Sequence, residues 1–101
     1  MFCKSYNDFF QTLANQTNQI IIDALLKGPK TVTEIVEITK LEQSKVSHAL
    51  KRLADCKLVK SKQKGKHRIY ELNKNTIIPI LEIADKHAKK MCPVCTKIKH
   101  E

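Results

Sequence analysis

The sequence predicts a mainly helical fold that carries one small β-hairpin. Apolar residues recur at helical spacing over most of the 101-residue chain, whereas strand-like segments occur at 58–62 and 68–72. An apolar content of 42% with two glycines also favours a compact, helix-rich protein. We therefore expect one folded domain over residues 1–91, followed by a short tail over residues 92–101.

Two helices are expected to open the chain. Over residues 3–14, four large side chains share one helical stripe, which suits either core packing or a dimer surface: Tyr6, Phe9, Phe10 and Leu13. Residues 19–27 form a nearly continuous apolar run that stops at Gly28-Pro29. We expect residues 15–18 to supply the break and the caps between these helices, and the second helix to be buried on most sides.

A third helix is expected from Thr31 to about Lys40. Thr31 and Glu34 have the spacing of a capping box, in which each side chain accepts a hydrogen bond from the other residue's backbone N–H. A tight turn should follow, and a fourth helix should run from Glu42 to about Cys56.

The fourth helix has one apolar and one polar face. Its apolar positions 46, 49, 50 and 53 would turn inward, so the remaining side chains would point outward. The outward set mixes hydrogen-bonding groups with positive charge, which a helix needs to read base edges between phosphates. The predicted outward residues are Gln43, Ser44, Lys45, Ser47, His48, Lys51 and Arg52.

The segments 58–62 and 68–72 are expected to pair as a hairpin. Gly65, within the 63–66 connection, can take the positive φ that a tight hairpin requires. An isolated hairpin is only marginally stable in water, so this one should pack on the helices. A basic hairpin beside a base-reading helix is a wing, which completes a winged helix-turn-helix. Its predicted phosphate contacts are Lys62, Lys64, Lys66 and Arg68.

The last helix is expected to be capped by Thr76, with Pro79 in its first turn, where no backbone donor is missed. An apolar stripe continues from Ile77 to Met91. We expect this helix and the first one to form a homodimer interface. A two-fold dimer suits palindromic double-stranded DNA, because each subunit then reads one half-site.

Positive charge is concentrated in one segment. Between Lys40 and Tyr70 there are ten Lys or Arg residues against Glu42 and Asp55, a net +8 out of +9 for the whole chain. A solvated lysine-rich face is the alternative interpretation. Because the charge coincides with the helix-turn-helix pattern, we favour a nucleic-acid partner.

Other classes of protein are disfavoured. The sequence has no apolar run near the ~18 residues that span a bilayer and no secretory leader, so we expect a cytoplasmic protein without a membrane partner. It has no glycine-rich phosphate loop, nucleophile elbow or paired-carboxylate pocket, so we expect no enzyme activity and no required cofactor.

The motif Gln43-Ser44-Lys45-Val46-Ser47-His48-Ala49-Leu50 resembles the recognition helix of the ArsR/SmtB family of small, dimeric winged-helix repressors. The segments 13–22 and 58–72 complete the resemblance, which covers about residues 9–87. It implies sequence-specific operator binding, with transcription altered when an inducer changes the dimer.

The sequence departs from the family at both usual metal sites. Thr31 and Thr33 stand where soft-metal sensors of the family carry Cys-x-Cys, and hydroxyls are poor ligands for soft metals. Lys40 stands where many relatives have Gly, and Glu42 where Ser often caps the recognition helix. Four positions of the last helix match the family's zinc or nickel site, and only the histidine among them is a potential metal ligand: Lys74, Thr76, His87 and Lys90.

The cysteines leave three interpretations open. Cys92-Pro93-Val94-Cys95 could form a reversible disulfide, could bind zinc or another thiophilic metal with help from Cys3, or could be an unpaired thiol pair in the tail. Cys56 is expected to be a small buried core residue.

The sequence therefore predicts a dimeric, sequence-specific DNA-binding transcriptional regulator, a repressor by family, controlled by a thiol or metal signal at the C-terminal cysteine pair. One alternative is a thiol or metal sensor or binding protein whose main chemistry is that pair. Another is a winged helix that docks on protein or RNA, because the fold does not dictate its partner.

Overall fold

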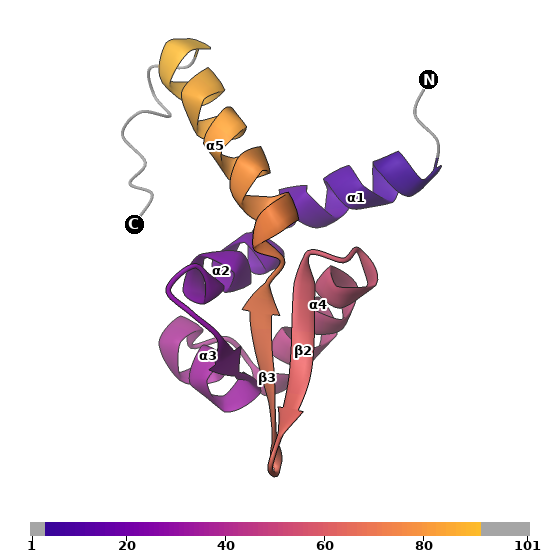
Figure 1. The fold of residues 1–101 in the computed structure, drawn as a ribbon, viewed down its shortest axis with the longest axis vertical. Coiled ribbons are helices and arrows are strands. Elements are labelled where there is room, and N and C mark those ends of the chain that lie inside the picture. The colour runs from indigo at the N-terminus through magenta and orange to yellow at the C-terminus, as the bar shows by residue number, and fades with distance from the viewer. Residues whose placement is uncertain (1–3, 92–101) are drawn as a thin grey trace.

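The computed structural model describes residues 4–91 and confirms a mainly helical fold with one hairpin (Figure 1). None of the helices described in this range is long and apolar enough to cross a lipid bilayer. The elements, in chain order, are α1 (Lys4–Ala14), α2 (Gln16–Leu25), β1 (Lys30–Thr31), α3 (Val32–Thr39), α4 (Gln43–Asp55), β2 (Val59–Lys64), β3 (His67–Leu72) and α5 (Lys74–Met91).

The helix α2 begins earlier than the predicted position 19. Asn15 is its N-cap, and the Asn15 Oδ1 accepts a hydrogen bond of 3.0 Å from the backbone N–H of Asn18. Asn18 is only 2% exposed, and its side-chain amide donates to the Thr12 carbonyl over 2.9 Å. A polar residue can therefore be buried inside α2, because it satisfies a carbonyl of the last turn of α1.

The core lies between α2, α4 and the sheet. The apolar residues between positions 20 and 26 are buried apart from Ile20 in α2 and Leu26 at its C-cap, each 38% exposed. The buried cluster draws on every described element except α1 and β1, and it consists of Ile21, Ile22, Leu25, Ile35, Val46, Ala49, Leu50, Leu53, Leu58, Val59, Leu72 and Ile77.

The capping box that opens α3 is confirmed. The Thr31 hydroxyl accepts from the Glu34 backbone N–H over 3.2 Å, and a Glu34 carboxylate oxygen accepts from the Thr31 N–H over 2.8 Å. That second hydrogen bond holds the pKa of the Glu34 carboxyl below its ordinary value, because it favours the charged form.

A short third strand, β1, was not predicted. It pairs antiparallel with β3, with Lys30 opposite Tyr70 and Thr31 opposite Ile69, and gives a sheet of order β1-β3-β2. A two-residue strand is too short to show period-2 alternation. Because Thr31 both ends β1 and caps α3, the sheet fixes where α3 begins.

The turn between α3 and α4 contains a residue in the left-handed region. Lys40 has φ 62° and ψ 18°, and its N–H donates to the Val36 carbonyl over 2.8 Å. The Thr39 hydroxyl donates to the Ile35 carbonyl over 2.7 Å and accepts from the Leu41 N–H over 3.3 Å. The left-handed conformation brings a side chain's Cβ close to the following carbonyl oxygen, so a lysine is strained here.

The hairpin is longer and its turn tighter than predicted. The two strands pair from Val59 opposite Leu72 to Lys64 opposite His67, which leaves a two-residue turn of Gly65-Lys66. The predicted positive φ of Gly65 is confirmed at 63°.

The predicted start of the last helix is wrong. α5 begins at Lys74, so Thr76 is not its cap and Pro79 lies inside the helix, beyond the first turn. The Asn73 carbonyl accepts from the N–H groups of Thr76 and Ile77, each over 3.0 Å. The Asn73 side-chain amide also donates to the Lys57 carbonyl over 2.9 Å. This tertiary contact starts the helix early, although Pro79 supplies no N–H to it.

The strain at Lys40 gives a stability prediction. Lys40→Gly should raise the free energy of unfolding, by up to about 1 kcal/mol, because glycine adopts positive φ at little steric cost. Lys45→Gly is the matched control inside α4 and should lower it by about 0.5–1 kcal/mol. Urea denaturation of the three proteins measures both effects. A Lys40→Gly protein no more stable than the parent would contradict strain at this turn.

Candidate nucleic-acid interface

The helix α4 presents the two faces that the sequence predicts. Val46, Ala49, Leu50 and Leu53 are all buried, and Leu50 and Leu53 are fully inaccessible. Because four apolar residues at helical spacing are buried, the orientation of α4 about its own axis is fixed. The side chains on the other face are all exposed: Gln43, Ser44, Lys45, Ser47, His48, Lys51 and Arg52.

The chain reverses direction directly after α4. Lys57 has φ 62° and donates to the Ala54 carbonyl over 3.0 Å, while the Leu58 N–H donates to the Leu53 carbonyl over 3.0 Å. These two bonds form a Schellman motif, and the accompanying apolar contact between Leu53 and Leu58 is buried in the core. The reversal therefore sends β2 back along α4.

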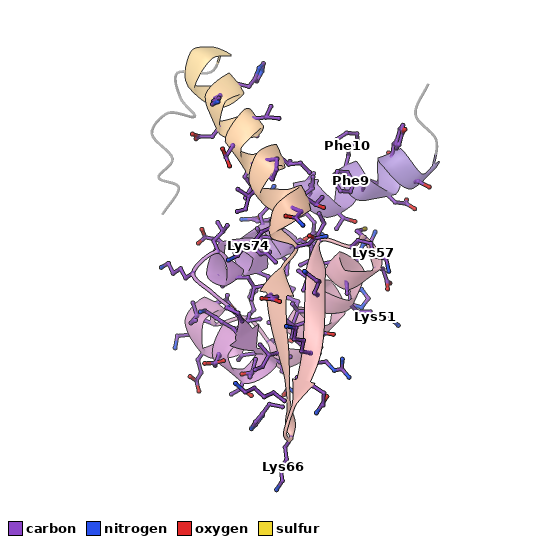
Figure 2. All side chains as sticks on the ribbon, viewed as in Figure 1. Phe9, Phe10, Lys51, Lys57, Lys66 and Lys74 are labelled. Atoms are coloured by element: carbon purple, nitrogen blue, oxygen red, sulfur yellow. The ribbon has the colours of Figure 1, made fainter. Side chains whose placement is uncertain are left out.

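This reversal brings the hairpin tip to the N-terminal end of α4. The 13 residues of α4 and the six of β2 both extend about 20 Å, at ~1.5 Å per helical and ~3.4 Å per strand residue. Figure 2 shows Lys66 at the tip, whereas Lys57 lies at the far end of the hairpin, near α5. The start of α4 and the cationic turn thus face the same end of the molecule.

The first turn of α4 has no side-chain cap. Glu42 occupies the N-cap position with φ −65° and ψ 145°, but its exposed carboxylate makes no capping hydrogen bond. Ser, Thr, Asp and Asn are the residues that usually accept from the free N–H groups at this position. Glu42 stands where relatives often carry a capping serine. The N–H groups at the start of α4 therefore have no side-chain acceptor from the N-cap residue.

The four predicted wing contacts are all exposed. Lys62 and Lys64 lie on β2, Lys66 lies in the turn, and Arg68 lies on β3. The Arg68 Nη1 donates to the Ser61 hydroxyl over 3.0 Å across the hairpin. The structure thus gathers the predicted helix and wing residues on α4 and the adjoining hairpin, although they are up to 25 positions apart in the sequence.

The helices α1 and α5 lie at the other end of the molecule (Figure 1), and they carry a separate set of exposed apolar side chains. The predicted α1 stripe divides: Phe9 and Leu13 pack against the core, while Tyr6 and Phe10 are 57% and 54% exposed. Ile83 on α5 is 69% exposed. Exposed large apolar side chains at one end of a small domain are typical of an association surface.

The described residues contain no candidate metal centre. Between residues 4 and 91, no group of three or more His, Cys, Asp or Glu side chains could hold an ion. Thr31, at the position of the family's soft-metal site, is engaged in the capping box. Cys56 is partly buried rather than fully buried, with its Sγ 3.4 Å from the Thr12 hydroxyl. The predicted ligands Cys3, Cys92 and Cys95 lie outside the described residues.

Comparison with known sequences identifies several regulators. A family model described as "Bacterial regulatory protein, arsR family" matches residues 15–61. The arsenical resistance operon repressor of Bacillus subtilis is 32% identical over 79 residues, which cover 77% of this chain and 75% of that protein. The probable mercury resistance operon repressor of Streptomyces lividans is 31% identical over 98 residues, covering 92% and 77%. The regulator NmtR of Mycobacterium tuberculosis is 32% identical over 81 residues, covering 80% and 68%.

Comparison with solved structures gives the same fold. Rv0081 of M. tuberculosis superposes with a TM-score of 0.80 at 25% identity, covering 90% of this chain and 92% of that one. The reduced form of the regulator YodB from B. subtilis gives 0.73 at 26% identity, covering 91% and 96%. A homodimeric winged helix-turn-helix domain, Mb0332 of Mycobacterium bovis, gives 0.78 at 20% identity, covering 96% and 88%. The fold is therefore a winged helix-turn-helix.

Proposed function

The chain belongs to the arsR family of bacterial regulatory proteins, and from that membership we propose that it is a dimeric, sequence-specific DNA-binding repressor of transcription. One observation carries the proposal: α4 exposes seven polar or basic side chains along one face, and the helix begins at the end of the molecule where the cationic hairpin turn lies. A protein of this kind acts on the genome, so we place it in the cytoplasm and assign it no catalytic activity.

The exposed residues divide into two roles. Residues near the start of α4 enter the major groove and meet base edges, as the recognition helix of a helix-turn-helix does. Basic residues further along α4 and on the hairpin meet the sugar-phosphate backbone, which positions the protein without reading sequence. We assign base contacts to Gln43, Ser44, Lys45, Ser47 and His48, and phosphate contacts to Lys51, Arg52, Lys62, Lys64, Lys66 and Arg68.

We assign the apolar end of the molecule to the homodimer. Tyr6, Phe10 and Ile83 are exposed on α1 and α5, away from the start of α4. A two-fold dimer through these helices carries two copies of α4, which would read half-sites of a palindrome about 34–36 Å apart, one turn of DNA.

We assign the signal to the cysteine pair of the tail. Two of the relatives are named as arsenical and mercury resistance operon repressors, and thiolates are the ligands that soft metals prefer. Cys92 and Cys95 carry this role either as ligands for zinc or another thiophilic metal or as a dithiol that closes to a disulfide. DNA binding itself requires no cofactor in this proposal.

Selection from a library of random duplexes tests the DNA-binding function. The full-length protein should enrich a palindromic sequence and bind it more tightly than a scrambled duplex of equal length. Ser47→Ala should then reduce discrimination at particular base pairs by about 1–3 kcal/mol. Lys51→Gln should instead weaken binding to all sequences and flatten its salt dependence by about one unit per phosphate contact. Equal affinity for selected DNA, scrambled DNA and duplex RNA would overturn the assignment.

The dimer surface gives a second test. Ile83→Lys should shift the protein from dimer to monomer in sedimentation equilibrium, because a charge on the interface would have to be desolvated. Ile38→Lys is the matched control, since Ile38 is also exposed, at 56%, but lies on α3. A dimer that tolerates Ile83→Lys as well as Ile38→Lys would show that α5 does not form the interface.

The role of the tail is tested by comparing operator affinity for the reduced, oxidised and zinc-loaded protein. At least one of the latter two states should differ from the reduced state, and Cys92→Ser with Cys95→Ser should abolish the difference. Cys56→Ser is the control and should retain it. Equal affinity in all three states would confine the tail cysteines to an incidental role.

A further inference from the structure

The strand register divides the wing's basic residues between two faces of the hairpin. Val59 and Leu72 are paired and both buried, so their face packs on the core. Side chains alternate along a strand, so the pairs Ser61–Tyr70 and Gln63–Arg68 share that face. The pairs on the opposite, outer face are Lys60–Glu71, Lys62–Ile69 and Lys64–His67.

Side-chain contacts agree with this division. Arg68 donates to Ser61, and both residues belong to the core-side face. Tyr70, also on that face, packs against the core cluster. Four outer-face residues line one shallow hollow, which also reaches Pro29 and the intervening Gln63: Lys62, Lys64, Ile69 and Glu71.

The recognition helix lies on the core side of the sheet. α4 contacts β2, and its Leu50 and Leu53 share the core cluster with Val59. Figure 1 shows α4 behind the hairpin, on one side of it only. DNA lying along α4 is therefore on the same side as Arg68, whereas Lys62 and Lys64 point to the other side.

We propose that Lys62 and Lys64 bind the phosphate backbone of duplex DNA beyond the half-site, on the side of the wing opposite α4. This inference rests on the proposed function and extends its DNA surface. The wing crosses the duplex at its tip, with Lys66 at the crossing, Arg68 toward the half-site and the two outer lysines toward flanking DNA. The occupant follows from charge, because a row of exposed ammonium groups complements the phosphates.

The three lysines on the outer face differ in their distance from the hairpin tip, and those nearer the tip are expected to contact DNA. Lys64 adjoins the turn, and Lys62 is about 7 Å further back along the strand, at ~3.4 Å per residue. Lys60 is about 14 Å back and stands opposite the carboxylate of Glu71. Lys60 thus shares the face and the residue type of the other two lysines but lies outside the contact, which makes it a matched control.

Duplexes of two lengths distinguish the DNA contacts of the outer face of the hairpin from those of its core-side face. The probes are the selected palindrome trimmed to its two half-sites and the same palindrome extended by about one helical turn, ~10 base pairs, at each end. Affinities are measured by fluorescence anisotropy across a salt series. Wild-type protein should bind the extended probe more tightly. The slope of log affinity against log salt concentration should also be steeper for that probe, by about 0.9 for each added phosphate contact.

The double variant K62Q/K64Q should abolish this length dependence, so it should weaken binding to the extended probe by a larger factor than binding to the trimmed probe. R68Q should weaken binding to both probes by the same factor, and K60Q should behave as the wild type. The proposal is overturned if wild-type affinity does not depend on length, if K62Q/K64Q weakens both probes equally, or if K60Q loses the length dependence as fully as K62Q/K64Q.

Failure of this inference is distinct from failure of the proposed function. A protein that prefers the palindrome to a scrambled duplex but ignores its flanks remains a sequence-specific binder whose outer lysines are solvated. A protein without that preference fails as a sequence-specific binder, whatever the effect of length.

Discussion

Burial of one apolar stripe of α4 is the constraint on which the rest of the structure depends. Val46, Ala49, Leu50 and Leu53 pack against α2 and the sheet, and at ~1.5–3 kcal/mol for a fully buried large aliphatic side chain they outweigh any single surface contact. Because the stripe turns inward, the polar face has to turn outward. The same residues that stabilise the domain thus decide which side chains are available to a partner.

The two ends of α4 determine how the neighbouring elements lie relative to its exposed polar face. At the C-terminal end, the Schellman motif at Lys57 reverses the chain and lays the hairpin alongside the helix. At the N-terminal end, Lys40 sets the turn from α3. Both lysines have φ of 62°, a conformation that glycine adopts more easily. The chain carries positive charge even where backbone geometry would favour a residue without a side chain.

Local patterns were predictable from the sequence, and long-range ones were not. The Thr31–Glu34 capping box and the two faces of α4 depend on residues within one or two helical turns, so their spacing alone was sufficient. β1 exists only because it pairs with β3, and α5 starts at Lys74 because Asn73 bonds to Lys57. Likewise, the exposed wing lysines were predictable, but their division between two faces required the exact strand register, since a shift of one residue would exchange the faces.

The hydrogen bond from the Asn73 side chain to the Lys57 carbonyl has a mechanical consequence. It joins the root of α5, at the apolar end, to the reversal that ends the recognition helix. Pro79, six residues beyond Asn73, removes one backbone hydrogen bond within α5 and makes a bend at that point easier than a displacement of the start of the helix. Bending of α5 about the proline therefore leaves this hydrogen bond in place, and the bond restrains the start of α5 relative to the reversal after α4.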